Sequence, residues 1–353
     1  MEKQVLVVDD SALIRRELGK LLTGAGFEVE FAKNGSEAVE KVMEYDFDAV
    51  TMDINMPIMD GLSAVKLIMK QKPTPIVMVS SLTQGDADIT FEALDYGAVD
   101  FVGKPGTITL KVKESGDDII GKVTAASKMS KSRLMIRKAG NVIKSNLGKK
   151  VEKKTLSRTT KVKKIVLIGA STGGPGLIEK IATSVGADYP YPICVVQHMP
   201  ELFTQKFASR LDKISNLNVM EAKNSEPLTP GKIIIGRGGY HLQFTKKASG
   251  LISIKLGANI NKSFFVPSVD EMFFSAANTF NCSDILAIEL TGIGDDGALG
   301  MVELKKKGAY TIAESQETAT IYGMPRVAFE KGGTVKVLPF PKIIDEILKF
   351  GRS

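Results

Sequence analysis

Along the first 130 residues, short apolar runs alternate with longer stretches whose apolar residues recur at helical spacing. Apolar runs between polar turns are typical of buried parallel strands, and the longer stretches are typical of amphipathic helices. Strands are expected at residues 4–8, 47–52, 75–79 and 99–102. Helices are expected at residues 11–23, 36–44 and 117–129. Ser11 and Ser36 begin the first two helices and are candidate N-caps.

A second alternating pattern begins at residue 165. Its expected strands lie at residues 165–168, 193–197, 233–235, 285–290, 310–313 and 334–338. Its expected helices lie at residues 175–184, 270–278, 296–307 and 341–350. Alternation of this kind favours parallel sheets with helices on both faces. The predicted fold class is therefore α/β, with two doubly wound parallel-sheet domains.

The two patterns are separated by a basic segment without sustained periodicity. From residue 131 to residue 164 there are 13 Lys and Arg residues and one acid, Glu152. The positive charge of this segment is therefore larger than the net charge of the whole chain, which is +7. A segment rich in Lys, Ser and Thr is predicted to be a flexible, solvated linker. The expected boundaries are residues 1–130 for the first domain, 131–162 for the linker and 163–353 for the second domain.

The overall composition, with 43% apolar and 25% charged residues, is that of a globular protein. No apolar run is long enough to cross a bilayer, and residues 1–10 lack the basic start and apolar stretch of a secretory signal. A cytoplasmic protein is therefore expected. Cys194 and Cys282 lie in or beside apolar runs without a C-x-x-C pair, so buried thiols are expected rather than a disulfide or zinc site.

Polar side chains follow several strands of the first domain. Asp9, Asp10 and Asp53 each come after an expected strand, and ligands of an open parallel sheet bind beyond the carboxyl ends of its strands. Three converging carboxylates would repel one another unless a divalent cation such as Mg²⁺ shared them. Ser80 and Lys104 end two further strands, and a hydroxyl and an ammonium suit a phosphorylated aspartate. Asp53 is therefore the candidate nucleophile toward a phosphoryl donor.

Residues 1–130 resemble the receiver family of two-component systems. The resemblance rests on Val-Val-Asp-Asp at residues 7–10, Met-Asp-Ile-Asn-Met-Pro at 52–57, Asp-Gly at 60–61, Ser80 and Lys-Pro at 104–105. It implies a flavodoxin-like domain phosphorylated on Asp53 by a histidine kinase. It also implies Mg²⁺ bound by Asp10, Asp53 and the Asn55 backbone carbonyl, with Asp9 nearby. Phe101 takes the position of the family's aromatic switch residue, and Ser80 stands where the family often has Thr.

In the second domain, the strand at residues 165–168 runs into Gly-Ala-Ser-Thr-Gly-Gly-Pro, which contains the G-x-S-x-G pattern of a nucleophile elbow. Small neighbours would expose Ser171 above the sheet, and Pro175 suits the first turn of the next helix. The N-terminus of that helix, with the Thr172 N–H as one donor, would stabilise an oxyanion. The alternative is a phosphate-binding glycine turn, although this turn has neither a P-loop nor a G-x-G-x-x-G pattern.

A serine nucleophile needs a base, and the chain has two histidines. His198 follows the strand at residues 193–197, on the sheet edge expected for Ser171, and is the preferred base. His241, in a less regular stretch, is the alternative. The acid that orients the imidazole is expected in the glycine-bounded loop after the strand at residues 285–290, where Asp295 and Asp296 are both candidates. Either acid would also suit a cap of the following helix.

Residues 163–350 resemble the catalytic domain of the chemotaxis response-regulator methylesterase family. The resemblance rests on the elbow at residues 169–175, Gln-His-Met-Pro at 197–200, Thr-Gly-Ile-Gly-Asp-Asp-Gly at 291–297 and Tyr-Gly-Met-Pro at 322–325. It implies Ser171 as nucleophile, His198 as base and Asp296 as orienting acid, with the Ile293 N–H near the oxyanion. One departure concerns the substrate cleft, where Gly236-Arg237-Gly238 replaces the family's Ala-Pro-Gly.

Together the two resemblances imply a phosphorylation-activated serine hydrolase that demethylates glutamyl methyl esters, and deamidates selected glutamines, on methyl-accepting chemoreceptors. The implied partners are these receptors and a chemotaxis histidine kinase, with Mg²⁺ in the receiver and no cofactor in the catalytic domain. Neither nucleic-acid binding nor membrane insertion is expected. The alternatives are receiver-controlled nucleotide binding or a DNA-binding output. The basic segment alone favours the latter, because no helix-turn-helix or zinc pattern follows it.

Overall fold

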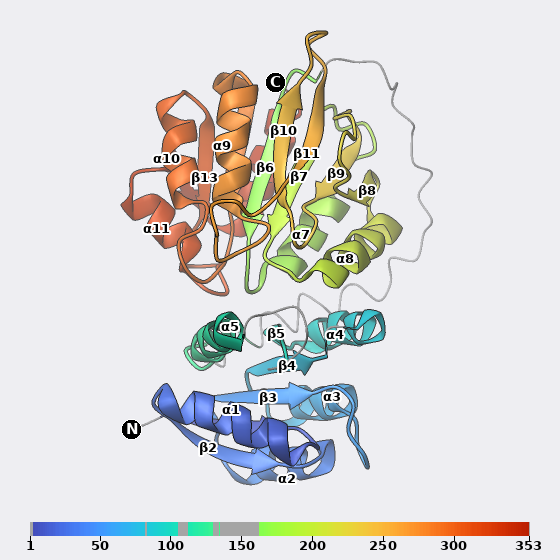
Figure 1. Cartoon of the computed structure of the whole chain (residues 1–353), viewed down its shortest axis with the longest axis vertical. Coiled ribbons are helices and arrows are strands. Elements are labelled where there is room, and N and C mark those ends of the chain that lie inside the picture. The colour runs from blue at the N-terminus through green and yellow to red at the C-terminus, as the bar shows by residue number, and fades with distance from the viewer. Residues whose placement is uncertain (1–2, 82, 105–111, 130–133, 135–161, 353) are drawn as a thin grey trace. The chain divides into compact units, whose positions relative to one another are not determined.

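The computed structural model describes residues 3–81, 83–104, 112–129, 134 and 162–352. The chain divides into two compact units, residues 1–148 and 149–353, which are described separately (Figure 1). Most of the predicted linker, residues 131–162, lies outside the described residues, so its flexibility and the exact domain boundaries stay predictions. Among the helices that are described, none is both long and apolar enough to cross a membrane.

The first unit contains a parallel sheet whose five described strands have the order β2-β1-β3-β4-β5. The strands are β1 (Lys3–Val8), β2 (Phe27–Ala32), β3 (Ala49–Asp53), β4 (Ile76–Ser80) and β5 (Asp100–Gly103). The helices are α1 (Ala12–Gly24), α2 (Gly35–Glu44), α3 (Gly61–Gln71), α4 (Gln84–Tyr96) and α5 (Val112–Ala126). This is the flavodoxin-like, doubly wound order, and the predicted fold class of this domain is confirmed.

Two helix starts in this unit test the predicted caps. Ser11 caps α1, as expected, because its hydroxyl accepts from the Ile14 N–H at 3.5 Å. The cap of α2 is Asn34 instead of the predicted Ser36, since the Asn34 side-chain oxygen accepts from the Glu37 N–H at 2.9 Å. Ser36 already lies inside the helix. Ser and Asn cap helices about equally well, so the local pattern could not separate them.

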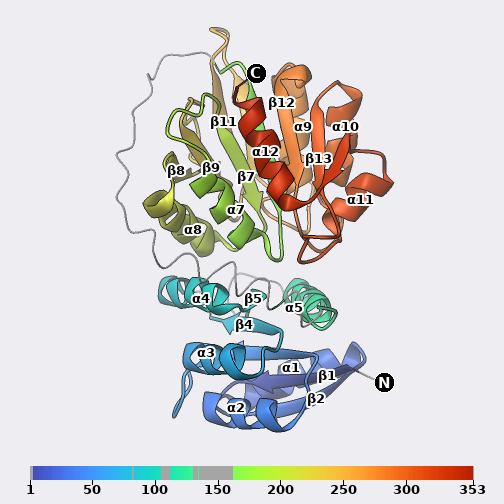
Figure 2. The same cartoon turned by 180° about the vertical axis from the view of Figure 1, so that it is seen from behind.

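The second unit is built on a parallel sheet whose seven described strands have the order β14-β13-β12-β6-β7-β9-β8. The strands are β6 (Ile165–Ala170), β7 (Ile193–Gln197), β8 (Asn218–Glu221), β9 (Lys232–Ile235), β12 (Ile285–Glu289), β13 (Tyr310–Glu314) and β14 (Lys336–Leu338). The helices are α7 (Gly174–Ser184), α8 (Glu201–Ile214), α9 (Val269–Thr279), α10 (Ala298–Lys306), α11 (Met324–Glu330) and α12 (Phe340–Phe350). Helices α9 and α10 lie on one face (Figure 1), and α7 and α12 lie on the other (Figure 2), which confirms the predicted architecture.

An antiparallel hairpin of β10 (His241–Lys246) and β11 (Ile252–Gly257) was not predicted. It forms a separate two-stranded sheet, and Phe244 and Ile254 contribute to the same hydrophobic core as α9 and the main sheet. The predicted helix at residues 296–307 starts later than expected. Helix α10 begins at Ala298, and Gly297, with φ 98°, occupies the N-cap position without a side-chain cap. Asp296 therefore precedes α10 and does not cap it, so its side chain can accept hydrogen bonds from another element.

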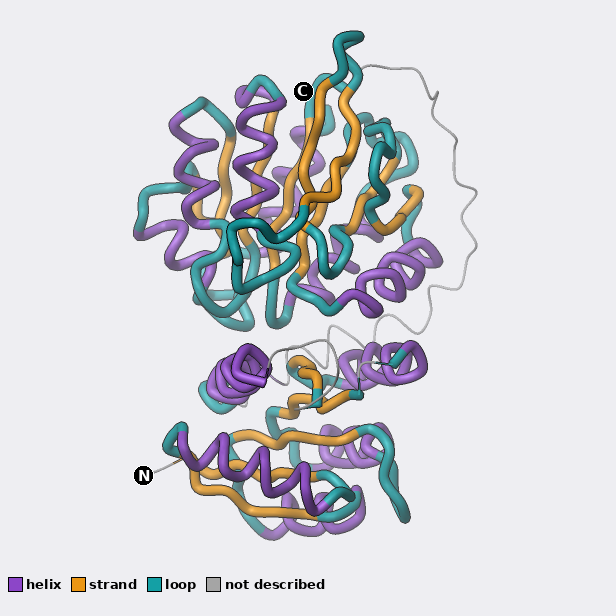
Figure 3. Tube along the Cα trace, in the orientation of Figure 1, coloured by secondary structure: helices purple, strands orange, loops and turns teal. Residues whose placement is uncertain are grey.

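The order of strands places a topological switch at the centre of the second sheet. Strand β6 has β7 on one side and β12 on the other, and every residue of these three strands is buried. In open parallel sheets, ligands bind at such a switch, beyond the carboxyl ends of the strands. Loops gather there at one end of the sheet (Figure 3). Ser171 follows β6, His198 follows β7 and Asp296 follows β12, so all three side chains start from the same edge.

Candidate active site and acidic pocket

Ser171 stands in the turn between β6 and α7, where its backbone makes three hydrogen bonds. The Ser171 N–H donates to the Thr291 carbonyl at 2.9 Å, and the Ser171 carbonyl accepts from the Gly174 N–H at 2.8 Å and from Gln197 Nε2 at 2.9 Å. Gly173 has φ 82°, and a Cβ at this position would lie 2.5 Å from a neighbouring side chain. The turn therefore requires glycine, and it has the strand-turn-helix form expected from the G-x-S-x-G pattern.

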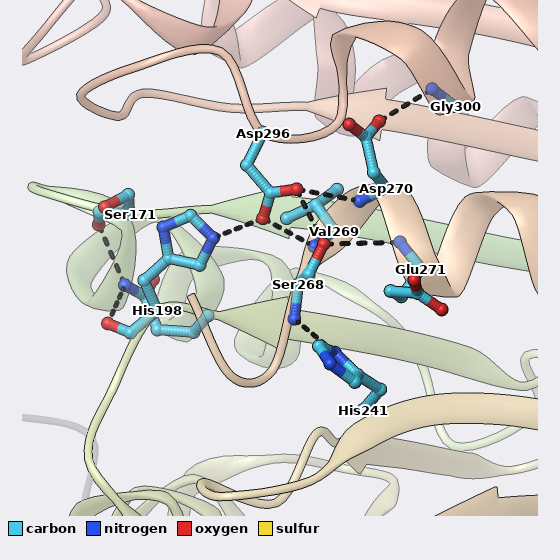
Figure 4. A network of polar contacts seen from close by, with 10 residues as sticks. Ser171, His198, His241, Ser268, Val269, Asp270, Glu271, Asp296 and Gly300 are labelled. Carbon is cyan, nitrogen blue, oxygen red and sulfur yellow. Dashed lines mark hydrogen bonds and ion pairs between the residues drawn. The ribbon is translucent and has the colours of Figure 1, made fainter. Parts of the chain in front are cut away.

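His198 lies between Ser171 and Asp296 (Figure 4). Its Nε2 is 2.7 Å from Asp296 Oδ2, and its backbone N–H donates to the Ala170 carbonyl at 3.0 Å. Nδ1 is buried and has no hydrogen-bond partner within the described part of the chain. Because the carboxylate accepts the Nε2–H, we assign Nδ1 as the unprotonated nitrogen. The imidazole thus presents a basic nitrogen on the side opposite its acid, where a serine proton can be received.

Phe265 fixes the plane of the same imidazole. The two rings stack with their centroids 3.8 Å apart and an angle of 9° between their planes. The stack and the hydrogen bond to Asp296 together restrict both the position and the rotation of the His198 ring. No feature of the sequence pattern marked Phe265 as part of the site.

Asp296 is bound by four donors, three of them at the start of α9. Its Oδ1 accepts from Ser268 Oγ at 2.7 Å and from the Asp270 N–H at 3.0 Å, and its Oδ2 accepts from the Val269 N–H at 2.7 Å as well as from His198. Burial would raise the pKa of Asp296, but the bond and charge of His198 and the helix amides outweigh it and lower the pKa. This carboxylate is therefore held ionised at a helix N-terminus.

The structure separates the two acids that the sequence left open. Asp296 contacts His198, whereas its neighbour Asp295 is exposed and makes no contact with the imidazole. It also separates the two histidines. His241 is buried in β10, where its Nδ1 accepts from the Ser268 N–H at 3.2 Å and its Nε2 lies 3.3 Å from Asn259 Oδ1. Both ring nitrogens of His241 thus contact other residues, namely the Ser268 backbone and the Asn259 side chain. The geometry therefore favours His198 as the base.

The loop after β12 lies directly against Ser171. A Cβ at Gly292 would be 2.8 Å from Ser171 Cβ, so Ile293 begins beside the serine. The Ile293 N–H makes no hydrogen bond to any other residue that the structure describes. The Thr291 hydroxyl donates to the Thr172 carbonyl at 2.9 Å and so joins this loop to the elbow. Thr172 and Ile293 remain the candidate oxyanion donors, a role that stays a prediction.

A further carboxyl group, that of Glu289 at the end of β12, lies fully buried near Asp296. Neither of its oxygens has a hydrogen-bond partner among the described residues. A Cβ at Gly169 or at Gly297 would lie 3.0 or 2.1 Å from these oxygens, so the two glycines provide the space that the carboxyl fills. Burial, and then the charges of Asp296 and Asp270, raises the pKa of Glu289 well above its usual range. No sequence pattern marked Glu289 as part of the site.

In the first unit, the predicted acidic pocket is formed. Asp9, Asp10 and Asp53 each offer a carboxylate oxygen, and these oxygens all lie within 4.8 Å of one another. Lys104 Nζ lies 3.0 Å from Asp9 Oδ2 and 2.9 Å from Asp53 Oδ2. Burial raises the pKa of Asp53, the bond from Lys104 opposes this, and the Asp9 charge raises it again, for a net upward shift. A pocket of oxygen donors that disfavours its own charge fits a hard divalent cation.

The remaining predicted receiver residues lie on β4, on β5 and just after β3. Ser80 is fully buried, and its carbonyl accepts from the Lys104 N–H at 2.8 Å. Phe101 is also buried, with its ring edge-on to Phe91 at a centroid distance of 6.4 Å. The Asn55 side chain donates through Nδ2 to an acid of α4 at 3.1 Å, and its backbone carbonyl is the predicted metal ligand. The metal, phosphorylation and switch roles of these residues stay predictions.

Two family models match this chain. The model of the CheB methylesterase matches residues 166–347, and the model of the response regulator receiver domain matches residues 5–112.

Relatives cover almost the whole sequence. The chain is 44% identical to the protein-glutamate methylesterase/protein-glutamine glutaminase 2 of Carboxydothermus hydrogenoformans over 99% of each chain. It is 43% identical to the protein-glutamate methylesterase/protein-glutamine glutaminase of Archaeoglobus fulgidus, over 98% of this chain and 97% of that one. The crystal structure of the Thermotoga maritima CheB methylesterase catalytic domain is 38% identical, with a TM-score of 0.51, over 53% of this chain and 98% of that chain.

Proposed function

The chain belongs to the CheB methylesterase family, and we propose that it is a phosphorylation-activated serine hydrolase that removes methyl groups from glutamyl methyl esters of chemoreceptors. The arrangement of Ser171, His198 and Asp296 at one sheet edge carries this proposal, above all the 2.7 Å contact between His198 and Asp296. The relatives whose names combine methylesterase and glutaminase activity support the substrate class.

The ester is hydrolysed in two half-reactions. His198 Nδ1 takes the Ser171 proton while Oγ attacks the ester carbonyl carbon, and the Thr172 and Ile293 N–H groups bind the oxyanion that forms. The bond to the methoxy oxygen then breaks, and methanol leaves with the proton from His198. Water, deprotonated by the same imidazole, attacks the acyl-enzyme and releases the glutamate carboxylate and free Ser171.

Asp296 orients the imidazole and stabilises its protonated form throughout these steps. Since its pKa is lowered and its oxygens already accept four hydrogen bonds, it stays ionised and does not take the proton itself. Glutamine deamidation follows the same route. The leaving group is then ammonia in place of methanol, and His198 supplies the proton that it needs.

We also propose that phosphorylation of Asp53 controls the esterase. A receiver domain brings with it a Mg²⁺-dependent phosphorylation site, and Asp9, Asp10, Asp53 and the Asn55 carbonyl would hold the ion. When bound, the cation neutralises charge on the carboxylates and on the transferred phosphoryl group. Asp53 Oδ is the nucleophile, and Lys104 and Ser80 bind the phosphoryl oxygens. The phosphorylated receiver shifts the chain toward its active state.

The proposed partners follow from this chemistry. Methyl-accepting chemoreceptors are the substrate and a chemotaxis histidine kinase is the phosphodonor, and the enzyme meets both in the cytoplasm. No cofactor is required in the catalytic domain, because a serine, an imidazole and a carboxylate complete the reaction.

Mass spectrometry of receptor peptides tests the function directly. Methylated receptor is incubated with wild type, Ser171→Ala or Asp53→Asn, each with and without Mg²⁺ and a small acyl phosphate. The wild type should convert glutamyl methyl esters to glutamates, and faster with the phosphodonor, while Ser171→Ala should convert none. Demethylation by Ser171→Ala would contradict the assignment of Ser171 as the nucleophile. A normal response of Asp53→Asn to the phosphodonor would contradict the assignment of Asp53 as the phosphorylation site.

A further inference from the structure

Between β11 and α9, residues 259–268 contain adjacent phenylalanines and are called here the aromatic loop. Phe265 is partly buried, and its ring stacks on the catalytic imidazole of His198. Phe264 is 53% exposed and meets Phe265 edge-on, with ring centroids 4.8 Å apart and planes at 84°. The exposed Phe264 ring thus contacts the ring that stacks on His198, the proposed base.

Hydrogen bonds hold this loop at both ends. His241 bridges them, because Nε2 contacts Asn259 at the start and Nδ1 accepts from the Ser268 N–H at the end. Asn259 closes a turn within the loop, where its Oδ1 accepts from the Ser263 N–H at 2.8 Å and its Nδ2 donates to the Ser263 carbonyl at 3.0 Å. Asn261 adds a bond from Nδ2 to Glu271 Oε1 at 2.9 Å. Phe264 is therefore exposed on a loop whose conformation is held by hydrogen bonds.

Exposed apolar side chains are ordinary when scattered, but here they share one loop, which contacts His198 through Phe265. Ile260 is 84% exposed and Phe264 is 53% exposed, while Lys262 between them places an exposed cation in the same loop. A glutamyl side chain is short, so the backbone that carries it must pass close to the rim of the Ser171 site. The exposed residues of the loop that contacts His198 are therefore apolar or amide side chains with one positive charge and no acid, which suits an amphipathic helix that has acidic positions.

We propose that the aromatic loop is the substrate-reading element of the esterase. Phe264 binds the apolar face of the substrate helix beside the reacting glutamyl residue, and Phe265 is a positioning residue that holds His198. The proposal deepens the proposed function, on which it rests, and it names the surface by which the enzyme recognises an acidic amphipathic helix. His241, which the sequence offered as a second base, acts as the brace of this loop.

Substitution of Phe264 and substitution of Phe265 should change different kinetic constants. Removing Phe264 takes away a contact made only with the protein substrate, so it should raise the KM for methylated receptor by about tenfold, as expected for one aromatic anchor. Its reaction with a small fluorophosphonate, which reports only the activated serine, should match the wild type. Removing Phe265 loosens the imidazole, so the labelling rate of Ser171 and the kcat on receptor should both fall by about tenfold.

The experiment uses the full chain with substitutions Phe264→Ala, Phe265→Ala and Phe265→Tyr, and with Phe329→Ala as a matched control, because Phe329 is exposed to a similar extent, 55%, on α11. Receptor demethylation gives kcat and KM, and fluorophosphonate labelling gives the intrinsic reactivity of Ser171. The proposal requires a raised KM with normal labelling in Phe264→Ala, slowed labelling in Phe265→Ala, restoration in Phe265→Tyr, and wild-type behaviour in Phe329→Ala.

Two outcomes would overturn the proposal while leaving the esterase function intact. One is a KM for Phe264→Ala equal to that of Phe329→Ala, and the other is labelling in Phe265→Ala at the wild-type rate. A wild-type enzyme that reacts with the fluorophosphonate but does not demethylate receptor would instead contradict the proposed function.

Discussion

Two aspartates at strand ends show how the surroundings of one side chain select its chemistry. Asp53 is the last residue of β3 and lies among other carboxylates, with the Lys104 ammonium between it and Asp9, and its pKa is raised. Asp296 follows β12 and meets four donors, and its pKa is lowered. Both are largely buried, so burial alone does not separate them.

The difference lies in how many donors each carboxylate meets. Asp53 lies in a pocket of several carboxylates, which fits the proposed roles of Asp53 as a cation ligand and as the nucleophile toward a phosphoryl group. Asp296 already accepts hydrogen bonds on both oxygens, so it orients His198 and is not a nucleophile. A carboxylate that accepts many hydrogen bonds is held in one orientation and suits a positioning role. A carboxylate that accepts few suits a reactive or metal-binding role.

The largest expected effect is that of Asp296→Asn. The amide keeps the shape but supplies an N–H in place of an acceptor, so His198 loses the tautomer that leaves Nδ1 basic. Serine hydrolases lose about 10⁴-fold in kcat from the equivalent change. Rates of receptor demethylation and of fluorophosphonate labelling measure the loss, with Asp295→Asn as the control because Asp295 is exposed and adjacent. A rate within tenfold of the wild type would contradict the role of Asp296.

Asp53→Asn should abolish the response to a phosphodonor. The variant cannot form an aspartyl phosphate, so its esterase rate should be the same with and without Mg²⁺ and an acyl phosphate. Intact-protein mass spectrometry should show the phosphoryl adduct in the wild type and not in the variant. Asp88→Asn, at an exposed position of α4, is the control and should be phosphorylated normally. An adduct of equal yield in Asp53→Asn would place the phosphorylation site elsewhere.

Ser268→Ala should have a smaller effect on the same triad. It removes the donor 2.7 Å from Asp296 Oδ1 but leaves the two helix amides and His198 in place. The loss of one hydrogen bond to a charged group should slow Ser171 labelling by about tenfold. Ser268 also caps α9, so calorimetry should record a modest loss of stability as well. Ser184→Ala, at the exposed end of α7, should change neither quantity.

The smallest expected effect concerns stability and pH. Because the pKa of Glu289 is raised in the folded state, the unfolded chain releases its proton first as the pH rises, and stability falls between the two pKa values. The slope is at most about 1.4 kcal/mol per pH unit. Glu289→Gln should flatten this dependence and make the second unit more stable near pH 8, by calorimetry of the full chain, whereas the exposed control Glu317→Gln should not. An unchanged slope would mean that Glu289 is already ionised in the folded protein.

Asp296 should act in the opposite direction, because its pKa is lowered. Its contribution to stability is present above the pKa of an unfolded aspartate and is lost as the pH falls through the folded value. The wild type should therefore lose stability toward both ends of the pH range, and Glu289→Gln should correct only the alkaline side.

The sequence located the reactive groups because parallel strands bring their carboxyl ends to one edge. Ser171, His198, Asp9 and Asp53 each follow a buried apolar run directly, so their positions could be predicted from the pattern alone. The choice between Asp295 and Asp296 could not, since the two differ only in which one meets the start of α9. That start is brought there by folding and lies far away along the chain.

Strand β2 and the β10–β11 hairpin are missing from the predicted elements for similar reasons. Strand β2 is an edge strand that alternates apolar and acidic residues, so it lacks the continuous apolar run by which its neighbours were identified. Hairpin β10–β11 and the aromatic loop lie outside the main sheet, and no local periodicity predicts that Phe265 will cover His198 or that His241 will brace Ser268. Contacts made across the fold by irregular segments are thus the part of the site that required coordinates.

The most direct test of the catalytic assignment is to map the site of fluorophosphonate modification by peptide mass spectrometry in wild type, His198→Gln and Ser171→Ala. One hydroxyl, activated by an imidazole that Asp296 holds in place, should carry the adduct. The account predicts modification of Ser171 in the wild type, strongly slowed modification in His198→Gln, and none at this peptide in Ser171→Ala. Modification of Ser171 at the same rate without the His198 imidazole, or of a different serine in the wild type, would contradict it.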